Sequence, residues 1–353
     1  MRIRTVLSVL ALCSSSSALA AAPLTQIGSL PCTYSTCASS VGARIKNSGR
    51  YLYAQTPNGL NVYDVRNPGA PALLTTVPSL TWGSDIIVGP RYLYLASAGG
   101  IQVADARNAA APVLVGQVAF QPGTANGYFA ALSGKYVYSG LNVVDVSDPT
   151  TPTLVATLPI SGSGRAQGLA ISGTNAYVVD DAGRVHIVDV SDPTAASEMG
   201  YLDLGEPAYD IAISGTYAYV VTHGQYCDEE GCTRIPGHLQ VLDISGPSCA
   251  RLVTSIGRPK GTEGIVISGG YAYLSERSCT FYSYQDELTV VDISNPSAPF
   301  DVAYAGNTGN SLSAAFGYGI QGVAVIGNAA FVTTPSNFFV YNAYTSGQQL
   351  QCQ

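Results

Sequence analysis

The sequence predicts an all-β fold built from seven copies of one unit, and two recurring motifs support it. A glycine followed by an aromatic strand recurs along the chain, for example in Ser133–Ser139 (SGKYVYS) and Ser214–Val221 (SGTYAYVV). A second motif, such as LNVVDVSDP or LTVVDISNP, follows each copy. The aligned aromatic residues are 39 to 58 positions apart, near the roughly 40–50 residues of a four-stranded blade. They are Tyr53, Tyr94, Tyr138, Tyr177, Tyr219, Tyr273 and Phe331. Seven such units predict one closed seven-bladed β-propeller.

The composition favours strands and turns and excludes a nucleic-acid partner. Gly (38) and Tyr (23) are abundant, whereas charged residues make up only 11% of the 353 residues. This amino-acid composition is poor in the Lys and Glu that helical bundles need. A formal net charge of −7 disfavours a phosphate-binding surface, because nucleic-acid affinity comes chiefly from Lys and Arg.

Residues 1–20 are predicted to be an export signal that is removed from the mature chain. Arg2 and Arg4 precede an apolar stretch, Val6–Cys13, and Ala18–Ala20 forms a small-x-small cleavage site. We therefore expect residues 21–353 to form the propeller and the protein to be periplasmic, secreted or at the cell surface. No later segment approaches the roughly 20 apolar residues of a transmembrane helix, so no transmembrane segment is expected.

Each unit is predicted to contain four short strands. In the fifth copy these begin with Asp210–Ser214, continue through YAYVV and LQVLDI, and end in a weaker strand after a Pro-containing turn. The seventh copy ends near its third strand, and Pro23–Gly28 resembles the fourth strand of other copies, such as Pro152–Thr157. We therefore expect the N-terminal strand to complete the last blade and close the ring.

These repeats resemble the LVIVD-repeat family, whose name matches segments such as LNVVDV and LTVVDI. The resemblance covers essentially the whole mature chain. It implies an exported or cell-surface bacterial or archaeal protein with four-stranded propeller blades, and it brings no general catalytic motif. The seventh copy departs most, because it has Asn342 where the other six have Asp.

The repeated residues themselves are predicted to be structural. An Asp at the end of each third strand precedes a turn rich in Asn, Asp and Pro, where Asp commonly accepts backbone N–H bonds of its own turn. The alternative, a ring of carboxylates around cations, would need residues of separate blades to share one ion. These residues are Asp64, Asp105, Asp145, Asp189, Asp243 and Asp292. The repeated tyrosines are expected to pack between blades with their hydroxyls at the solvent-facing edge.

Three insertions interrupt the repeat and are expected to gather on one face. They are Thr222–His238, Glu276–Glu287 and Gly306–Gly319. The loops between second and third strands emerge on the same face as the connections between blades, and loops lengthened beyond a repeat are typical sites of binding.

The insertions carry aromatic and charged residues, which favours a recognition surface. Tyr offers a large contact area for little loss of conformational entropy. The alternative is that these loops only pack their own aromatic residues. The candidate binding residues are Tyr226, Asp228, Glu229, Glu230, Arg234, Arg277, Phe281, Tyr282, Tyr284, Phe316 and Tyr318.

The first insertion also contains two cysteines, Cys227 and Cys232, for which we expect a local disulfide because an exported chain favours disulfides over thiolate ligands. A zinc site that adds His223 and His238 is the competing interpretation. A second local pair is expected before the first blade. Cys32 and Cys37 are expected to form that pair, whereas the pairing of Cys249, Cys279 and Cys352 stays open.

The central channel is a second candidate region, because residues that begin the innermost strands face the propeller axis. Carboxylates there either hold a Ca²⁺ ion or only solvate the channel. The aligned residues are Arg44, Asp85, Tyr128, Gln167, Asp210, Glu263 and Gln321. The chain has no nucleophile elbow, zincin helix or P-loop, and no catalytic residue is predicted.

These observations predict an exported, non-catalytic binding or scaffold propeller. The expected partner is a protein or glycan of the cell envelope, engaged by the enlarged loops of blades 5–7, and no cofactor is expected. The alternative is a propeller hydrolase or lyase that uses the channel carboxylates, with calcium as its ion.

Overall fold

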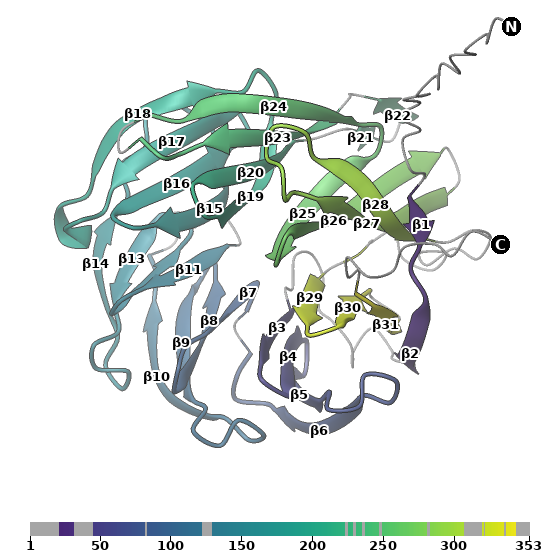
Figure 1. Cartoon of the computed structure of the whole chain (residues 1–353). Helices are drawn as coiled ribbons and strands as arrows, with labels where there is room; N and C mark the ends of the chain where they lie inside the picture. Colours follow the sequence, from purple (N-terminus) through teal and green to yellow (C-terminus); the bar gives the residue numbers. More distant parts are fainter. Residues whose placement is uncertain are drawn as a thin grey trace, which may run out of the picture.

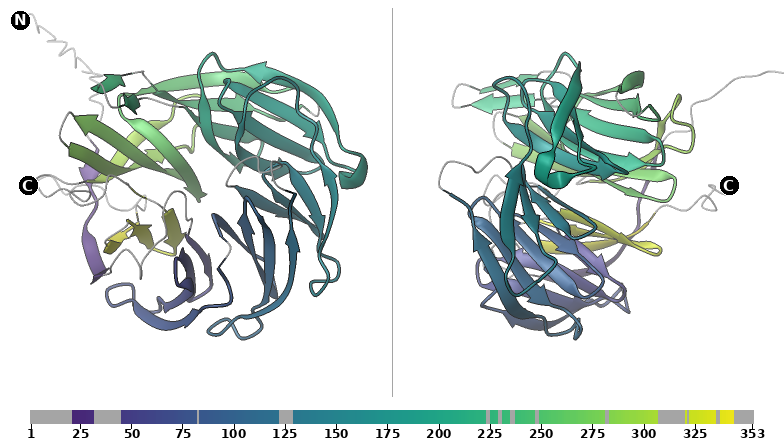
Figure 2. Two further views of the ribbon diagram at one scale, coloured as in Figure 1. Left: turned by 180° about the vertical axis from the view of Figure 1, so that it is seen from behind. Right: turned by 90° about the vertical axis from the view of Figure 1, so that its left-hand side faces the viewer.

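The computed structural model describes residues 21–31, 45–81, 83–121, 129–222, 225–228, 231–234, 237–246, 249–280, 283–306, 320, 322–334 and 337–343. Within them the chain forms seven sheets around a central axis and one separate two-stranded hairpin (Figures 1 and 2). The predicted seven-bladed β-propeller is therefore confirmed. In this part of the chain no helix is long and apolar enough to cross a membrane.

Each blade is an antiparallel sheet, and the first strands of successive blades contact one another around the axis (Figure 1). Blade 1 contains β3 (Ile45–Ser48), β4 (Tyr51–Thr56), β5 (Gly59–Asp64) and β6 (Ala72–Val77). Blade 2 contains β7 (Asp85–Val88), β8 (Tyr92–Ser97), β9 (Gly100–Asp105) and β10 (Val113–Ala119). Blade 3 contains β11 (Ala130–Ser133), β12 (Tyr136–Ser139), β13 (Asn142–Asp145) and β14 (Thr153–Thr157). Blade 4 contains β15 (Ala166–Ser172), β16 (Asn175–Asp180), β17 (Arg184–Asp189) and β18 (Ser197–Asp203), with the 3-10 turn η1 (Pro193–Ala195).

The remaining blades follow the same order, with one hairpin inserted. Blade 5 contains β19 (Ala208–Ser214), β20 (Tyr217–Thr222), β23 (Gly237–Asp243) and β24 (Arg251–Arg258), and the inserted hairpin is β21 (Gln225–Asp228) and β22 (Gly231–Arg234). Blade 6 contains β25 (Gly261–Ser268), β26 (Tyr271–Thr280), β27 (Ser283–Asp292) and β28 (Phe300–Gly306). Blade 7 contains β29 (Gly322–Ile326), β30 (Ala329–Thr333) and β31 (Asn337–Asn342).

The N-terminal segment closes the ring, as predicted, but it does so in two steps. β2 (Gln26–Pro31) pairs antiparallel with β31 as the fourth strand of blade 7. Just before it, β1 (Ala22–Pro23) pairs in parallel with β28 of blade 6, and the Leu24 N–H extends this contact by donating to a carbonyl of β28. The closing strand therefore starts three residues later than the predicted Pro23–Gly28, because the first residues are used on the neighbouring blade.

The hydrophobic core lies between the blades, because both faces of each sheet are apolar. The repeated aromatic side chains are all at most 6% exposed. Tyr53 of blade 1 packs with Ile86 and Leu93 of blade 2, and Tyr219 of blade 5 packs with Leu274 of blade 6. The prediction that these residues serve blade packing is confirmed.

The expectation that their hydroxyls face solvent is wrong for several of these tyrosines. The Tyr53 hydroxyl donates to the Ala109 carbonyl at 3.0 Å, and the Tyr219 hydroxyl donates to the Ile293 carbonyl at 3.5 Å. Both carbonyls belong to turns of the next blade, which cover the ring edge. Burial raises the pKa of Tyr53 and Tyr138 to about 12.

The aspartates that end the third strands organise their own turns, as predicted. In blades 1–6 each accepts the N–H of the residue two positions later, at 2.8 to 3.0 Å. This bond satisfies a backbone donor where the chain leaves the sheet. Cations reinforce some turns: the Lys135 ammonium lies 2.8 Å from the Asp145 carboxylate.

The turn of blade 3 makes a pH-dependent contribution to stability. The Lys135 ammonium first, and Ser147 second, lower the pKa of Asp145 to about 2. Its unfolded-state pKa is about 3.9, so the stabilisation is present above about pH 4 and is lost as the pH falls to about 2. We expect Asp145→Asn to lower the free energy of unfolding at pH 7 by roughly 0.5–1 kcal/mol, because the pair is largely exposed.

Urea denaturation followed by circular dichroism at pH 7, 4 and 2 measures this contribution. The difference between wild type and Asp145→Asn should shrink toward zero at pH 2, and Lys135→Gln should show the same trend. A difference that stays constant over this range would contradict the role of the ion pair.

Candidate functional site

The insertions of blades 5 and 6 lie on one face of the propeller, which carries the loops between second and third strands and the connections between blades. We call it the loop face. The hairpin β21–β22 stands between β20 and β23, and β26 and β27 of blade 6 are each ten residues long. β21 contacts β26, so the insertions of blades 5 and 6 lie against each other. The third insertion falls largely on residues 307–319, outside the described residues.

The structure places five of the predicted binding residues on these strands. They are Tyr226 and Asp228 on β21, Arg234 on β22, Arg277 on β26 and Tyr284 on β27. The others, Glu229, Glu230, Phe281, Tyr282, Phe316 and Tyr318, lie outside the described residues, as do Cys32, Cys37 and His223.

A second difference between blades appears where the third strand begins on the loop face. The residue five positions before the turn aspartate is a glycine with positive φ in blades 1–3 and a charged or titratable residue in blades 4–6. The glycines are Gly59, Gly100 and Gly140, and the replacing residues are Arg184, His238 and Glu287. A tight left-handed turn needs glycine, so blades 1–3 have no side chain at this position.

Each of the three replacing residues has a partner supplied by the outer strand or the blade connection. The Arg184 guanidinium lies 4.7 Å from the centre of the Tyr201 ring. The other two are contacts with charged groups: Nδ1 of His238 is 2.7 Å from Glu206, and Glu287 is 2.6 Å from the Lys260 ammonium. The loop face of blades 4–6 is therefore polar and charged beside the insertions. These residues were not predicted from the repeat pattern, although the difference is visible in the sequence when this one position is compared across the copies.

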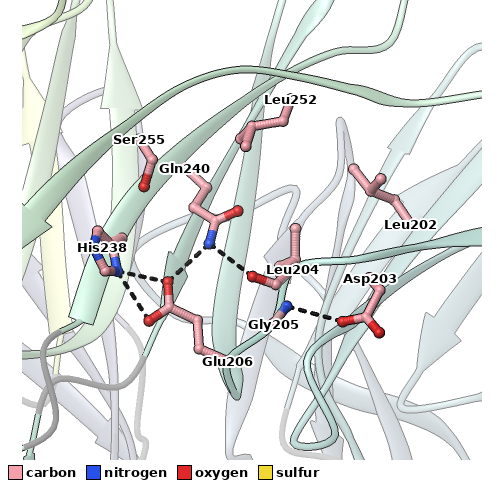
Figure 3. A pocket seen from close by; sticks show the side chains of 9 residues that line it. All are labelled: Leu202, Asp203, Leu204, Gly205, Glu206, His238, Gln240, Leu252 and Ser255. Atoms are coloured by element: carbon pink, nitrogen blue, oxygen red, sulfur yellow. Dashed lines mark hydrogen bonds and ion pairs between the residues drawn. The ribbon is translucent and has the colours of Figure 1, made fainter.

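The pair of Glu206 and His238 stands at a cavity of about 390 Å³ between blades 4 and 5 (Figure 3). Nδ1 of His238 is 2.7 and 2.9 Å from the two Glu206 oxygens, and Nε2 of Gln240 donates to Oε1 of Glu206 at 2.8 Å. Glu206 is thus held by two side chains of β23. The lining residues are Leu202, Asp203, Leu204, Gly205, Glu206, His238, Gln240, Leu252 and Ser255.

His186, in contrast, is completely enclosed. Its Nε2 is 3.1 Å from the Asp180 carboxylate and its Nδ1 is 2.7 Å from Glu198. Both ring nitrogens therefore face carboxylate oxygens, and the ring is 0% exposed. This histidine holds β16, β17 and β18 together and has no free nitrogen for a ligand.

A buried ionic cluster joins blades 5 and 6 below the loop face. Arg258 makes two hydrogen bonds to Asp301, at 2.9 and 2.8 Å, and its Nε lies 3.8 Å from Glu276. Burial raises the pKa of Glu276, while the nearby Arg258 charge and a hydrogen bond from Thr289 oppose this shift. Arg258 and Glu276 are buried, whereas the Asp301 side chain is 43% exposed, and the cluster connects β24 with β26 and β28 at the base of the blade 6 insertion.

The central channel residues are less free than their sequence positions suggest. Asp85 is 1% exposed and accepts the N–H of Ala130 in the next blade at 3.0 Å. Asp210 is 2% exposed and accepts the N–H of Ile265 in the next blade at 3.2 Å. Each carboxylate also accepts the N–H of the following residue. These two aspartates therefore connect the inner strands of neighbouring blades.

The other channel positions do not add a carboxylate cluster to these two. Glu263 is exposed, and Gln167 is partly buried in β15. Arg44, Tyr128 and Gln321 lie outside the described residues. Among the residues that the structure describes, no group of three or more His, Cys, Asp and Glu side chains has the arrangement of a metal site.

Removing the Asp210 carboxylate tests its role between blades. Asp210→Ala leaves the buried Ile265 N–H without its acceptor, so the free energy of unfolding should fall by about 1–3 kcal/mol. Urea denaturation measures the change, and Glu263→Ala at an exposed neighbouring position is the control, with an expected change within about 0.5 kcal/mol. Equal effects of the two substitutions would contradict a connecting role for Asp210.

Solved structures similar to this chain share its fold at very low sequence identity. The β-propeller domain of Cps50 (Swd1) from Myceliophteria thermophila has a TM-score of 0.65 at 12% identity, covering 91% of this chain and 100% of that one. A chain of the mitotic checkpoint complex has a TM-score of 0.62 at 11% identity, with coverages of 97% and 100%. The computationally designed Ika8 protein has a TM-score of 0.56 at 11% identity, with coverages of 90% and 99%. No curated protein sequence matches the chain.

The family comparison agrees with the repeats described above. The LVIVD repeat model matches residues 42–78, 130–158, 163–203, 205–226 and 260–303. These segments cover blades 1, 3 and 4 and large parts of blades 5 and 6. Five matched repeats within one closed ring show that the chain belongs to the LVIVD repeat family.

Proposed function

We propose that this protein is an exported, non-catalytic binding propeller that recognises a protein or glycan of the cell envelope. The observation that carries the proposal is the concentration of irregular features on one side of a regular ring. The β21–β22 hairpin, the long β26–β27 hairpin and the charged third-strand residues all lie on the loop face of blades 4–6. Loops and side chains that depart from the repeat and do not contribute to its packing are typical of recognition surfaces.

The channel geometry supports binding over hydrolase or lyase chemistry. Asp85 and Asp210 each bind two backbone N–H groups, so using them as acid, base or calcium ligand would break contacts between blades. His186 is likewise enclosed by two carboxylates. We therefore place the ligand on the loop face and propose no cofactor for it.

Export is part of the proposal and rests on the N-terminal sequence. The first strand starts at Ala22, just after the predicted cleavage site at Ala20. Cleavage there would leave β1 and β2 intact for their pairing with β28 and β31. The mature protein would then act in the periplasm, at the cell surface or outside the cell.

The hairpin can be removed without disturbing the blade, which gives a direct test of recognition. Oγ1 of Thr222 bonds the backbone N–H and C=O of His238, so an Asn-Gly turn in place of residues 223–237 would connect the two strands directly. We expect this variant to keep its melting temperature within a few degrees and to lose capture of its partner from an envelope extract of the producing cells.

The matched control replaces the three residues of η1, which lie at a turn of the opposite face, by Gly-Ser-Gly. Captured material is identified by mass spectrometry, with periodate treatment to separate glycan from protein partners. Capture that survives removal of the hairpin would contradict the proposal, provided that the control behaves as wild type.

The hairpin also gives a defined prediction for its two cysteines. In the β21–β22 register Cys227 lies directly opposite Cys232, one pair away from the turn. Directly opposed antiparallel residues lie within the Cα separation that disulfides require. In the exported protein we expect a peptide carrying a Cys227–Cys232 disulfide in a non-reducing digest. One equivalent of zinc in protein purified without chelators would contradict this and favour the thiolate alternative with His238.

A further inference from the structure

The cavity between blades 4 and 5 contains a buried acceptor that has no partner in the described part of the chain. The Gln240 side chain lines the cavity and is 4% exposed. Its Nε2 faces two acceptors, Oε1 of Glu206 at 2.8 Å and the Leu204 carbonyl at 3.3 Å, which fixes the orientation of the amide. Oε1 of Gln240 therefore points away from both, and no hydrogen bond reaches it there. A buried acceptor without a donor is costly, and because less than 1 Å² of this atom is exposed, a ligand donor reaches it only if the amide shifts toward the cavity.

A second polar group stands beside it. The Glu206 carboxylate accepts from Nδ1 of His238, so Nε2 is the ring nitrogen that remains for a ligand. The His238 side chain is 33% exposed. Ser255 is exposed directly across from Gln240 in the β23–β24 pairing, and its hydroxyl both donates and accepts.

Comparison with blade 2 shows that the fold does not need this arrangement. There Gln102 occupies the position of Gln240 and binds the preceding connection through the Ser79 carbonyl, at 3.1 Å. The position of His238 is occupied by Gly100 in blade 2, which makes the same contact to its connection without a histidine–carboxylate pair. The Glu206–His238 pair of blade 5 is therefore an addition to the structural role of the glutamine.

The remaining walls of the cavity decide which ligand fits. Leu202 and Leu252 supply aliphatic surface, and Leu252 is 48% exposed although it lines a cavity. Asp203 and Glu206 make the site electronegative and disfavour an anionic ligand. A pyranose ring combines hydroxyl donors with an apolar C–H face, and a volume of about 390 Å³ accommodates one such ring.

We propose that this cavity binds a neutral pyranose residue of a glycan. Its hydroxyls would form hydrogen bonds with Nε2 of His238 and the Ser255 hydroxyl, and its C–H face would pack on Leu252. This inference rests on the binding function proposed above and narrows its partner to a glycan. The cavity opens beside the base of the β21–β22 hairpin, since His238 is the second residue of β23.

Saturation-transfer NMR on the full-length mature protein tests the site with small probes. The probes are the methyl glycosides of glucose, galactose, mannose and N-acetylglucosamine, with methyl glucuronide as the anionic counterpart. We expect saturable binding of at least one neutral glycoside with a dissociation constant of about 1 mM, and binding of the glucuronide weaker by about tenfold or more.

Two exposed substitutions locate the binding and a third serves as control. Ser255→Ala and Leu252→Ala should each weaken binding of the neutral glycoside by about fivefold or more. Leu73→Ala is the matched control, because Leu73 has the same place on the outer strand of blade 1 and is 46% exposed. It should bind as wild type.

Absence of saturable binding by all four neutral glycosides overturns the inference, as does equal affinity of Ser255→Ala, Leu252→Ala and wild type. If the protein binds methyl glucuronide as tightly as the neutral glycosides, the restriction of the site to neutral sugars is wrong. The variant with the Asn-Gly turn keeps His238 and therefore the cavity. Its glycoside binding and its capture of envelope material are measured separately, so the two proposals can fail independently. Failure of the glycoside titration with capture still dependent on the hairpin would leave the proposed function standing.

Discussion

Every blade depends on its neighbours for stability, because a four-stranded sheet with two apolar faces would expose both of them to water if it stood alone. Tyr53 and Tyr219 fill the space between adjacent blades and donate their hydroxyls to the next blade. Asp85 and Asp210 repeat this connection at the inner strands. The result is a ring in which the repeated residues are occupied with packing, so the residues that deviate from the repeat are those available for recognition.

The parts of the structure that could be predicted from sequence are those that recur within one copy. The turn aspartates and the aromatic strands are local patterns, and seven copies determined the blade count. What could not be predicted depends on two blades at once: Glu206 reaches His238 across a blade boundary, and a turn of blade 2 covers the hydroxyl of Tyr53. A pattern within one repeat contains no information about what its neighbour places against it.

The charged residues of blades 4–6 show that one face of such a ring can change its side chains with little effect on the fold. Replacing Gly100 of blade 2 by the equivalent His238 of blade 5 changes only the outer start of the third strand, on the solvent side of the core. The backbone pairing beyond that residue is the same in both blades. Side chains and insertions at this edge are thus tolerated, whereas changes one pair deeper would meet the packed face of the next blade.

The closure of the ring also sets an order of events during synthesis. β2 is made near the start of synthesis, but its partner β31 is separated from it by nearly the entire chain, so the two can pair only after this last strand has emerged. Until the two pair, β31 has an open edge, and the N-terminal strand is an unpaired segment able to join other sheets. A newly made chain therefore has an unpaired strand at each end, and closing the ring joins the segments that are most distant in sequence.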